Sequence, residues 1–151
     1  MNCRQEGEGN SGVPHMVEME LNKIVIDEKR HEQLIVLKEK NGDRVLPIVI
    51  GLNEIAAIKS KISGVKPPRP ITHDLMFACV QALGATVNRI VIDKLENNIF
   101  FAKIIFAASD GQIKIVDARP SDSIALSVRA RAPIFVEEGV LKQMEIFNKE
   151  K

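Results

Sequence analysis

Tryptophan and tyrosine are absent from this chain of 151 residues, and phenylalanine occurs only six times. Proteins that bind single-stranded nucleic acids stack successive bases on aromatic rings, so an extended stacking surface is excluded unless phenylalanine forms it. Cysteine occurs twice, at Cys3 and Cys79, which gives neither a disulfide framework nor the ligand spacing of a zinc site. We therefore expect a protein of the reducing cytoplasm.

Long apolar runs and a large net charge are missing too. No segment approaches the roughly 20 apolar residues that cross a bilayer, so we expect no membrane association. Residues 1–15 lack the apolar centre of a signal peptide, and we interpret them as a flexible leader or a cloning remnant. With a net charge of +1, any contact with DNA or RNA would need a local basic patch.

The remaining composition is that of a folded domain. Hydrophobic residues make up 45% and charged residues 27% of the chain, which predicts one compact domain over residues 16–141 and a charged tail over residues 142–151. Strand and helix patterns occur together, so we predict an α+β fold with a mixed or antiparallel sheet and about three helices. The predicted strands are 17–26, 34–37, 45–50, 88–93, 100–106 and 113–116, and the predicted helices are 55–64, 72–84 and 121–128.

The second half of this pattern repeats the first. Asn88–Asp93 matches Asn22–Asp27 at five of six positions and keeps a basic residue at the sixth. At a constant offset of 69 residues, the later turn and helix start also coincide, with Asn53 falling on Asp122. We predict an internal duplication, in which two strand-strand-strand-helix halves are linked by one further helix.

The repeat allows the ends of the two third strands to be compared. It sets polar residues of the second half against apolar residues of the first. The pairs are Asp117 with Ile48, Arg119 with Ile50, and Ser121 with Leu52. Because an unpaired buried charge is strongly destabilising, the second half is either more exposed here or built to hold a ligand. We therefore expect the functional site in the second half.

The junction between the last predicted strand and its helix carries an acid and a base on one strand face, at Asp117 and Arg119. Ser121 is positioned to cap the helix, and Asp122 in the first turn favours the positive end of the helix dipole. A well-capped helix is the simpler interpretation. Capping does not explain the two opposite charges, which need a partner or a ligand.

A second junction has the same layout. In Arg69–Asp74 an arginine and a proline precede Thr72, the expected helix cap, and an acid follows. If the two helix starts face each other, Arg69 and Arg119, with Thr72 and Ser121, would form a phosphate site. The alternative is that each arginine pairs with its local acid.

His73 is a candidate for proton transfer, because histidine exchanges protons near neutral pH; a surface histidine is the alternative. Asp74, Asp117 and Asp122 are candidate catalytic carboxylates. Together they could hold Mg²⁺ or Mn²⁺ through oxygen ligands, with Asp117 and Asp122 as the main metal ligands, and Glu54 is a weaker candidate. The alternative is that these carboxylates only cap helices. The sequence contains no phosphate-binding glycine loop, glycine-flanked nucleophilic serine or paired-histidine zinc helix.

Four segments together resemble the bifunctional nuclease domain family. They are Leu46–Gly51, Arg69–Leu75, Asp117–Leu126 and Ala132–Val136, and the resemblance covers roughly residues 17–141. It implies a single α+β domain of bacteria and plants, often a homodimer, with DNase and RNase activity ascribed to some members. The matched polar positions are Arg69, Thr72, His73, Asp74, Asp117, Arg119, Ser121 and Asp122.

Three functions fit these residues. The first is a nuclease acting on DNA and RNA, in which the two arginines hold phosphate, the aspartates bind a metal ion or water, and His73 transfers a proton. The second is a non-catalytic regulatory module that binds an anion or another protein at the helix start. The third is an oligomeric structural protein that pairs through apolar strand edges near Pro47 or Pro133.

Overall fold

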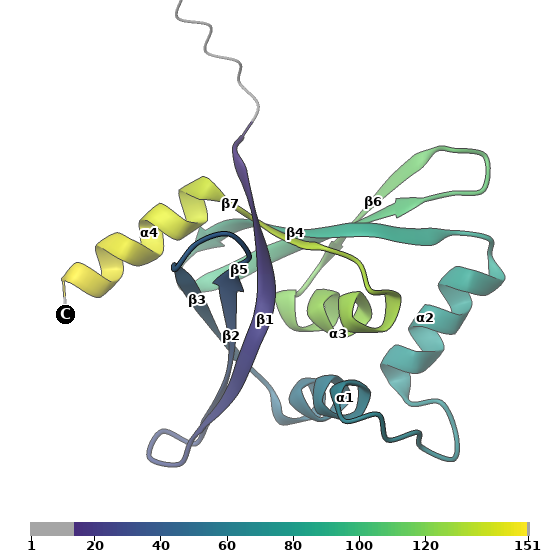
Figure 1. Cartoon of the computed structure of the whole chain (residues 1–151), viewed down its shortest axis with the longest axis horizontal. Coiled ribbons are helices and arrows are strands. Elements are labelled where there is room, and N and C mark those ends of the chain that lie inside the picture. Colours follow the sequence, from purple (N-terminus) through teal and green to yellow (C-terminus); the bar gives the residue numbers. More distant parts are fainter. Residues whose placement is uncertain (1–13, 151) are drawn as a thin grey trace, which may run out of the picture.

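Seven strands form one sheet in the computed structural model, which describes residues 14–150 (Figure 1). The strands are β1 Met16–Asp27, β2 Glu32–Glu39, β3 Val45–Ile50, β4 Thr86–Glu96, β5 Ile99–Ala107, β6 Ile113–Ala118 and β7 Ile134–Glu137. The helices are α1 Leu52–Ile62, α2 Thr72–Ala82, α3 Pro120–Ala130 and α4 Glu138–Lys149. The order across the sheet is β3-β2-β1-β7-β4-β5-β6, so the predicted α+β fold is confirmed.

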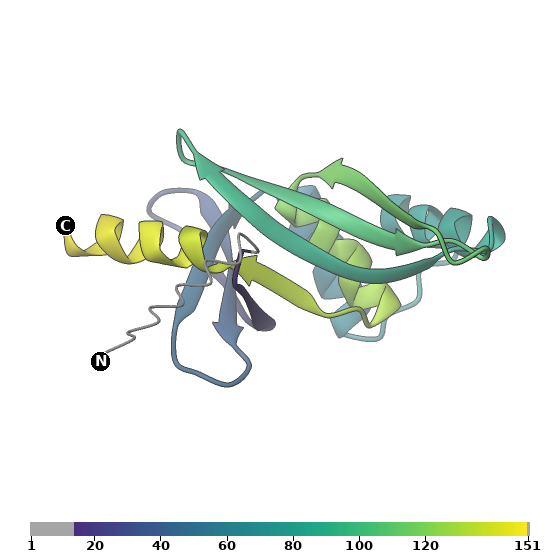
Figure 2. The same cartoon turned by 90° about the horizontal axis from the view of Figure 1, so that it is seen from above.

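The two halves of the sheet have the same plan. β1, β2 and β3 are antiparallel neighbours followed by α1, and β4, β5 and β6 are antiparallel neighbours followed by α3. β7 joins the halves, because it pairs antiparallel with β1 and parallel with β4. Seen from above, the strands of the first half run across those of the second (Figure 2). The strand-strand-strand-helix arrangement therefore occurs twice, as the repeat predicts.

The register of the repeat differs from the constant offset of 69. The third strands start at Val45 and Ile113, and the helices that follow start at Leu52 and Pro120, so the halves correspond here at an offset of 68. Asp117 then corresponds to Val49, which is 58% exposed. The predicted exchange of buried apolar packing for charge at this position is wrong. Turns absorb single-residue insertions, so one offset does not hold along the whole repeat.

The core lies between the sheet and two helices. α1 and α3 lie side by side against one face (Figure 1), and Ile58 and Leu126 of these helices are fully buried. From the sheet, Ile35, Leu37, Ile90 and Ile92 are also fully buried and belong to the same cluster. Each such side chain contributes about 1.5–3 kcal/mol through burial. This core holds the ends of β3 and β6 next to the starts of α1 and α3.

The two outer strands differ in how they are protected. β3 is an edge strand, as Pro47 predicts, and the proline removes one backbone donor from that edge. β6 is the opposite edge, and Ile113 and Ile115 are 56% and 63% exposed, although apolar residues at these positions suggest a buried strand. The predicted edge near Pro133 is also wrong, because β7 lies between β1 and β4.

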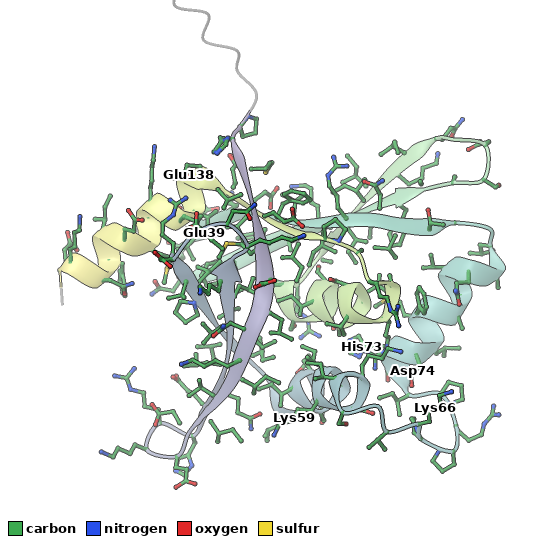
Figure 3. The ribbon with its side chains drawn as sticks, viewed as in Figure 1. Glu39, Lys59, Lys66, His73, Asp74 and Glu138 are labelled. Carbon is green, nitrogen blue, oxygen red and sulfur yellow. The ribbon has the colours of Figure 1, made fainter. Side chains whose placement is uncertain are left out.

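A fourth helix, α4, was not among the predicted helices. It continues to Lys149, across the boundary predicted between the domain and its charged tail. Arg44 ties α4 to the β2–β3 turn, with Nη1 2.6 Å from Glu138 Oε1 and Nη2 2.7 Å from Glu39 Oε1 (Figure 3). Residues 1–13 of the predicted leader lie outside the described residues.

Arg129 connects three helices from a buried position on α3, where it is 7% exposed. Its Nε donates to Asp74 Oδ1 of α2 at 2.8 Å, and its Nη1 donates to the carbonyl of Ala125 at 2.8 Å. Its Nη2 donates to the carbonyl of Ala57 in α1 at 3.1 Å. The guanidinium therefore fixes α1 and α2 relative to α3.

Replacing Arg129 with methionine should lower the free energy of unfolding by about 3 kcal/mol, because the partly buried Asp74 carboxylate loses its partner. Urea unfolding followed by circular dichroism would measure this. The control is Arg89→Met, because Arg89 is exposed and its side chain donates a hydrogen bond to the neighbouring Asn88. If Arg129→Met lowers the free energy of unfolding no more than Arg89→Met does, the role assigned to the Arg129 guanidinium is wrong.

Candidate functional site

Four polar side chains from three helices meet at the start of α3. His73 Nε2 on α2 lies 2.9 Å from Asp122 Oδ1 on α3. Arg119, the residue before α3, donates from Nε to Asp122 Oδ2 at 2.8 Å and from Nη2 to Glu54 Oε1 on α1 at 3.2 Å. We call Glu54, His73, Arg119 and Asp122 the helix-start cluster. The cluster brings His73 next to Arg119 and Asp122, although His73 and Asp122 are 49 residues apart in the sequence.

The carboxylate of Asp122 is the centre of the helix-start cluster. Partial burial would raise its pKa, but hydrogen bonds from Arg119 and His73 outweigh that effect and hold the pKa below its usual value. Asp122 is therefore ionised near neutral pH and orients the His73 ring. The His73 side chain is only 12% exposed, whereas the Arg119 side chain is 67% exposed and can reach a ligand.

The predicted helix caps are wrong. Ile71 is the residue before α2, and Thr72 is the first helical residue. The capping side chain is that of Asp74, whose Oδ2 accepts from the Ile71 N–H at 3.2 Å. Arg119 precedes α3, with Pro120 in the first turn and Ser121 inside the helix. A proline fits the first helical position because it has no N–H to satisfy, and this moves the start of α3 ahead of Ser121.

Other predicted site residues lie outside the helix-start cluster. Asp117 is exposed on β6, where Lys103 of β5 is its neighbour across the strands. Asp74 is held by Arg129, which gives it a structural contact. Arg69 and Thr72 are exposed, and within residues 14–150 neither makes a side-chain hydrogen bond or ion pair. Their predicted roles in phosphate binding stay predictions.

The donor set does not fit the predicted Mg²⁺ or Mn²⁺ site. Both oxygens of Asp122 already accept hydrogen bonds from His73 and Arg119, and Asp117 is exposed on β6, outside the helix-start cluster, opposite Lys103 of β5. In the part of the chain that the structure describes, no three His, Cys, Asp or Glu side chains are grouped to hold a metal ion. Hard cations prefer carboxylate and carbonyl oxygens without competing cationic donors.

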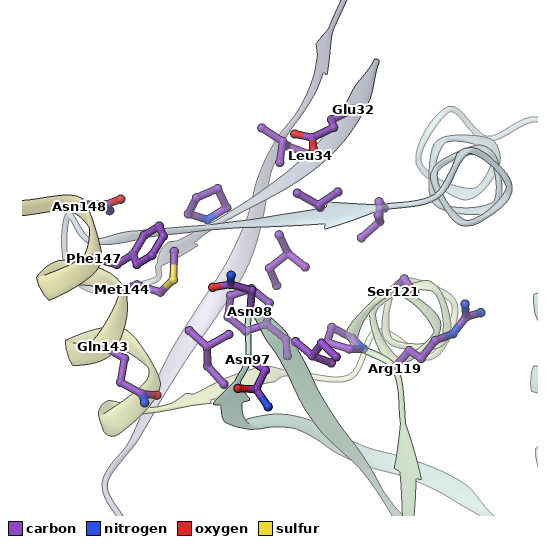
Figure 4. A pocket seen from close by; sticks show the side chains of 18 of the residues that line it. Glu32, Leu34, Asn97, Asn98, Arg119, Ser121, Gln143, Met144, Phe147 and Asn148 are labelled. Carbon is purple, nitrogen blue, oxygen red and sulfur yellow. The ribbon is translucent and has the colours of Figure 1, made fainter. Parts of the chain in front are cut away.

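A groove of about 1050 Å³ lies beside the helix-start cluster (Figure 4). Its walls are the edge of β3 with Pro47, the β4–β5 turn with Asn97 and Asn98, and α4 with Met144. One end is formed by the strand-to-helix junctions of both halves, at Gly51 and at residues 119–121. Arg119 and Glu54 belong to both the groove and the cluster.

Sequence reasoning missed Arg129 and most of the groove. A signal for Arg129 was present, because it follows Ala125 by four residues and so lies on the apolar face of its helix. A charged residue on such a face needs buried partners. The groove had no comparable signal, since its walls come from both halves and from the unpredicted α4.

Comparison with known proteins decides the family. The model of the bifunctional nuclease domain matches residues 35–149. This chain belongs to the bifunctional nuclease domain family. An uncharacterized protein of Mycobacterium tuberculosis is 44% identical over 128 residues, which cover 85% of this chain and 76% of that protein.

Plant members of the bifunctional nuclease domain family are more distant. Bifunctional nuclease 1 of Arabidopsis thaliana is 27% identical over 107 residues, covering 69% of this chain and 33% of that protein. Bifunctional nuclease 1 of Oryza sativa subsp. japonica is 20% identical over 116 residues, covering 76% of this chain and 35% of that protein. The shared region is thus about a third of each plant protein.

Within residues 14–150 of this family member, no helix combines the length and the apolar character that a membrane span requires.

The stability of the protein should depend on pH, because arginine side chains bind carboxylates and lower their pKa values. Partial burial would raise the pKa of Asp74, but hydrogen bonds from Arg129 and from the Ile71 N–H hold it below its usual value. A lowered folded-state pKa stabilises the protein above the pKa of the unfolded chain, and that stability is lost as the pH falls through the folded-state pKa. Between about pH 5 and pH 2 we therefore expect the free energy of unfolding to fall.

Asp74→Asn should be less stable than the wild type at pH 7 and should lose less stability over the same acid range. Urea unfolding at a series of pH values would measure both effects. Asp110→Asn serves as the control, because Asp110 is an exposed turn residue whose carboxylate accepts a hydrogen bond from the Gln112 N–H. Equal pH dependence in wild type and Asp74→Asn would show that Asp74 makes no such contribution.

Proposed function

We propose that this protein is a nuclease that hydrolyses phosphodiester bonds in DNA and RNA. The observation that supports this most is the His73–Asp122 pair beside an exposed arginine. A carboxylate that orients an imidazole gives the ring the protonation and direction needed to move a proton to or from a reacting oxygen. Family membership supports the same reaction class.

In this proposal each member of the helix-start cluster has a separate part. His73 accepts the proton of the attacking water or gives one to the leaving oxygen. Asp122 holds the ring in place and balances its charge. Arg119 binds the phosphate, because the donors of its guanidinium that face solvent match phosphate oxygens. Glu54 keeps the arginine next to the site through its 3.2 Å contact.

His73→Asn should lower nuclease activity at least about 100-fold, the usual contribution of general acid–base catalysis. Cleavage of single-stranded DNA and of RNA would be measured with purified protein. His31→Asn is the matched control, because His31 lies in an exposed turn with a φ of 53°, which asparagine tolerates. If His73→Asn cleaves as fast as the wild type, the proposed proton transfer by His73 is wrong.

The same cleavage assay tests whether the reaction requires a metal ion. A Mg²⁺ or Mn²⁺ cofactor would need ligands other than Asp117 and Asp122, because the described residues contain no group of three His, Cys, Asp or Glu side chains that could hold a metal ion. Activity in EDTA should equal activity in Mg²⁺ if the helix-start cluster acts without a metal ion. Loss of activity in EDTA would instead require metal ligands other than Asp122.

A second candidate function is a non-catalytic module that binds an anion. The groove favours it, because its volume of about 1050 Å³ is that of a site for a small ligand. Binding of a ligand by a protein that cleaves neither DNA nor RNA would support this second function over the first.

We also propose that the protein is a cytoplasmic homodimer that pairs through β6. This edge of the sheet exposes Ile113, Ile115 and Val116 and contains no proline, whereas the opposite edge carries Pro47. The presence of only two cysteines, with Cys79 free, is compatible with a reducing compartment.

Ile115→Lys should convert the dimer to a monomer, because it puts a charge at the centre of the open edge, where Ile115 is 63% exposed. Light scattering after size exclusion would measure the mass. Val45→Lys, on the opposite edge at 50% exposure, should remain dimeric. A wild-type mass of 16.8 kDa would contradict the dimer.

A further inference from the structure

The starts of α1 and α3 meet at one end of the groove. Gly51 and Arg119, which precede the two helices, both line this end, and the Arg119–Glu54 contact joins them. Neither helix start receives a hydrogen bond from a capping side chain. The N–H groups of a first helical turn have no acceptor within the helix, so the partial positive charges of two helices gather here.

Ser121 adds an independent feature at the same end. It is 7% exposed and lines the groove, and its hydroxyl has no hydrogen-bond partner among residues 14–150. The other serines of α3 are satisfied: Ser123 donates to the carbonyl of Arg119 and Ser127 to that of Ala132, both at 2.9 Å. Although the residue as a whole is buried, its hydroxyl oxygen keeps some accessible surface, so it is open to a partner that enters the groove.

The body of the groove combines apolar side chains with carboxamides. Phe100 of β5 and Met144 of α4 line it, and amides come from the β4–β5 turn and from α4 (Figure 4). These amides are Asn97, Asn98, Gln143 and Asn148. Aromatic rings contact the faces of nucleobases, and carboxamides donate to and accept from their edges. This part of the groove suits an uncharged heteroaromatic ring.

The charges along the groove limit how many phosphates it can hold. Four carboxylates line it, from Asp27, Glu32, Glu54 and Glu150, against the two guanidinium groups of Arg30 and Arg119. A nucleic acid strand lying lengthwise would place successive phosphates beside carboxylates. A ligand with one phosphate meets fewer of these carboxylates: at the helix starts the acid is Glu54, whose charge is balanced by its contact with Arg119.

We infer that the groove binds a nucleoside monophosphate, with its phosphate against Ser121, Arg119 and the first-turn N–H groups of α3, and its base beside Phe100 and Asn98. This inference rests on the proposed nuclease function, since such a ligand is the end of a strand or the product of its cleavage. It assigns the groove to a terminal nucleotide, in addition to the proton transfer assigned to His73.

Calorimetric titration of the full chain with AMP, CMP, GMP and UMP tests the inference, with adenosine and inorganic phosphate as separate arms. A monophosphate should bind at least about tenfold more tightly than either arm, because each arm lacks half of the contacts. Ser121→Ala should weaken monophosphate binding about tenfold, the effect of one hydrogen bond to a charged group. Asn98→Gly keeps the left-handed φ of 62° and should weaken monophosphate binding without changing phosphate binding.

The matched control is Ser127→Ala, a buried serine of the same helix that does not line the groove, and it should bind as the wild type does. Circular dichroism would confirm that each variant is folded. Wild-type affinity in Ser121→Ala, or no monophosphate binding at millimolar concentration, would overturn the inference. Cleavage without monophosphate binding overturns this inference alone, whereas monophosphate binding without cleavage overturns the proposed nuclease and leaves the groove assignment in place.

Discussion

The buried guanidinium of Arg129 sets the geometry on which the helix-start cluster depends. By binding Asp74 it holds the first turn of α2 against α3, and His73 is the residue next to Asp74. The same guanidinium holds α1 through the carbonyl of Ala57, and α1 carries Glu54. A side chain with no contact to Asp122 therefore determines which groups surround Asp122, which is how a supporting residue makes a polar site precise.

The internal duplication explains why two strand-to-helix junctions meet at one groove. The junctions have diverged in a complementary way, with Gly51 in the first half and Arg119 in the second. A β-carbon at Gly51 would lie 2.4 Å from Glu54 Oε2, so a larger residue there would make the Glu54 side chain move from the position in which it accepts from Arg119. The pairing of an empty position in one half with a long charged side chain in the other produces a site that neither half forms alone.

Local patterns gave most of the fold, and tertiary contacts decided most of the site. Hydrophobic periodicity located β3 residue for residue and identified α1, α2 and α3, because these signals lie within one element. The helix caps were mispredicted because proline and aspartate competed with serine and threonine for the same few positions. That His73 faces Asp122 could not be read from the chain, since the contact spans 49 residues and depends on a buried arginine. The exposure of β6 was unpredictable for a similar reason, because an apolar run looks the same at an edge as in the middle of a sheet.

The unequal edges of the sheet have a consequence for assembly. A sheet with two open edges can add copies at both sides without end, which is the route to fibres. Here Pro47 closes one side, so a contact between two β6 strands uses up the last free edge of each copy. In the proposed dimer, growth by strand addition would then stop at two chains.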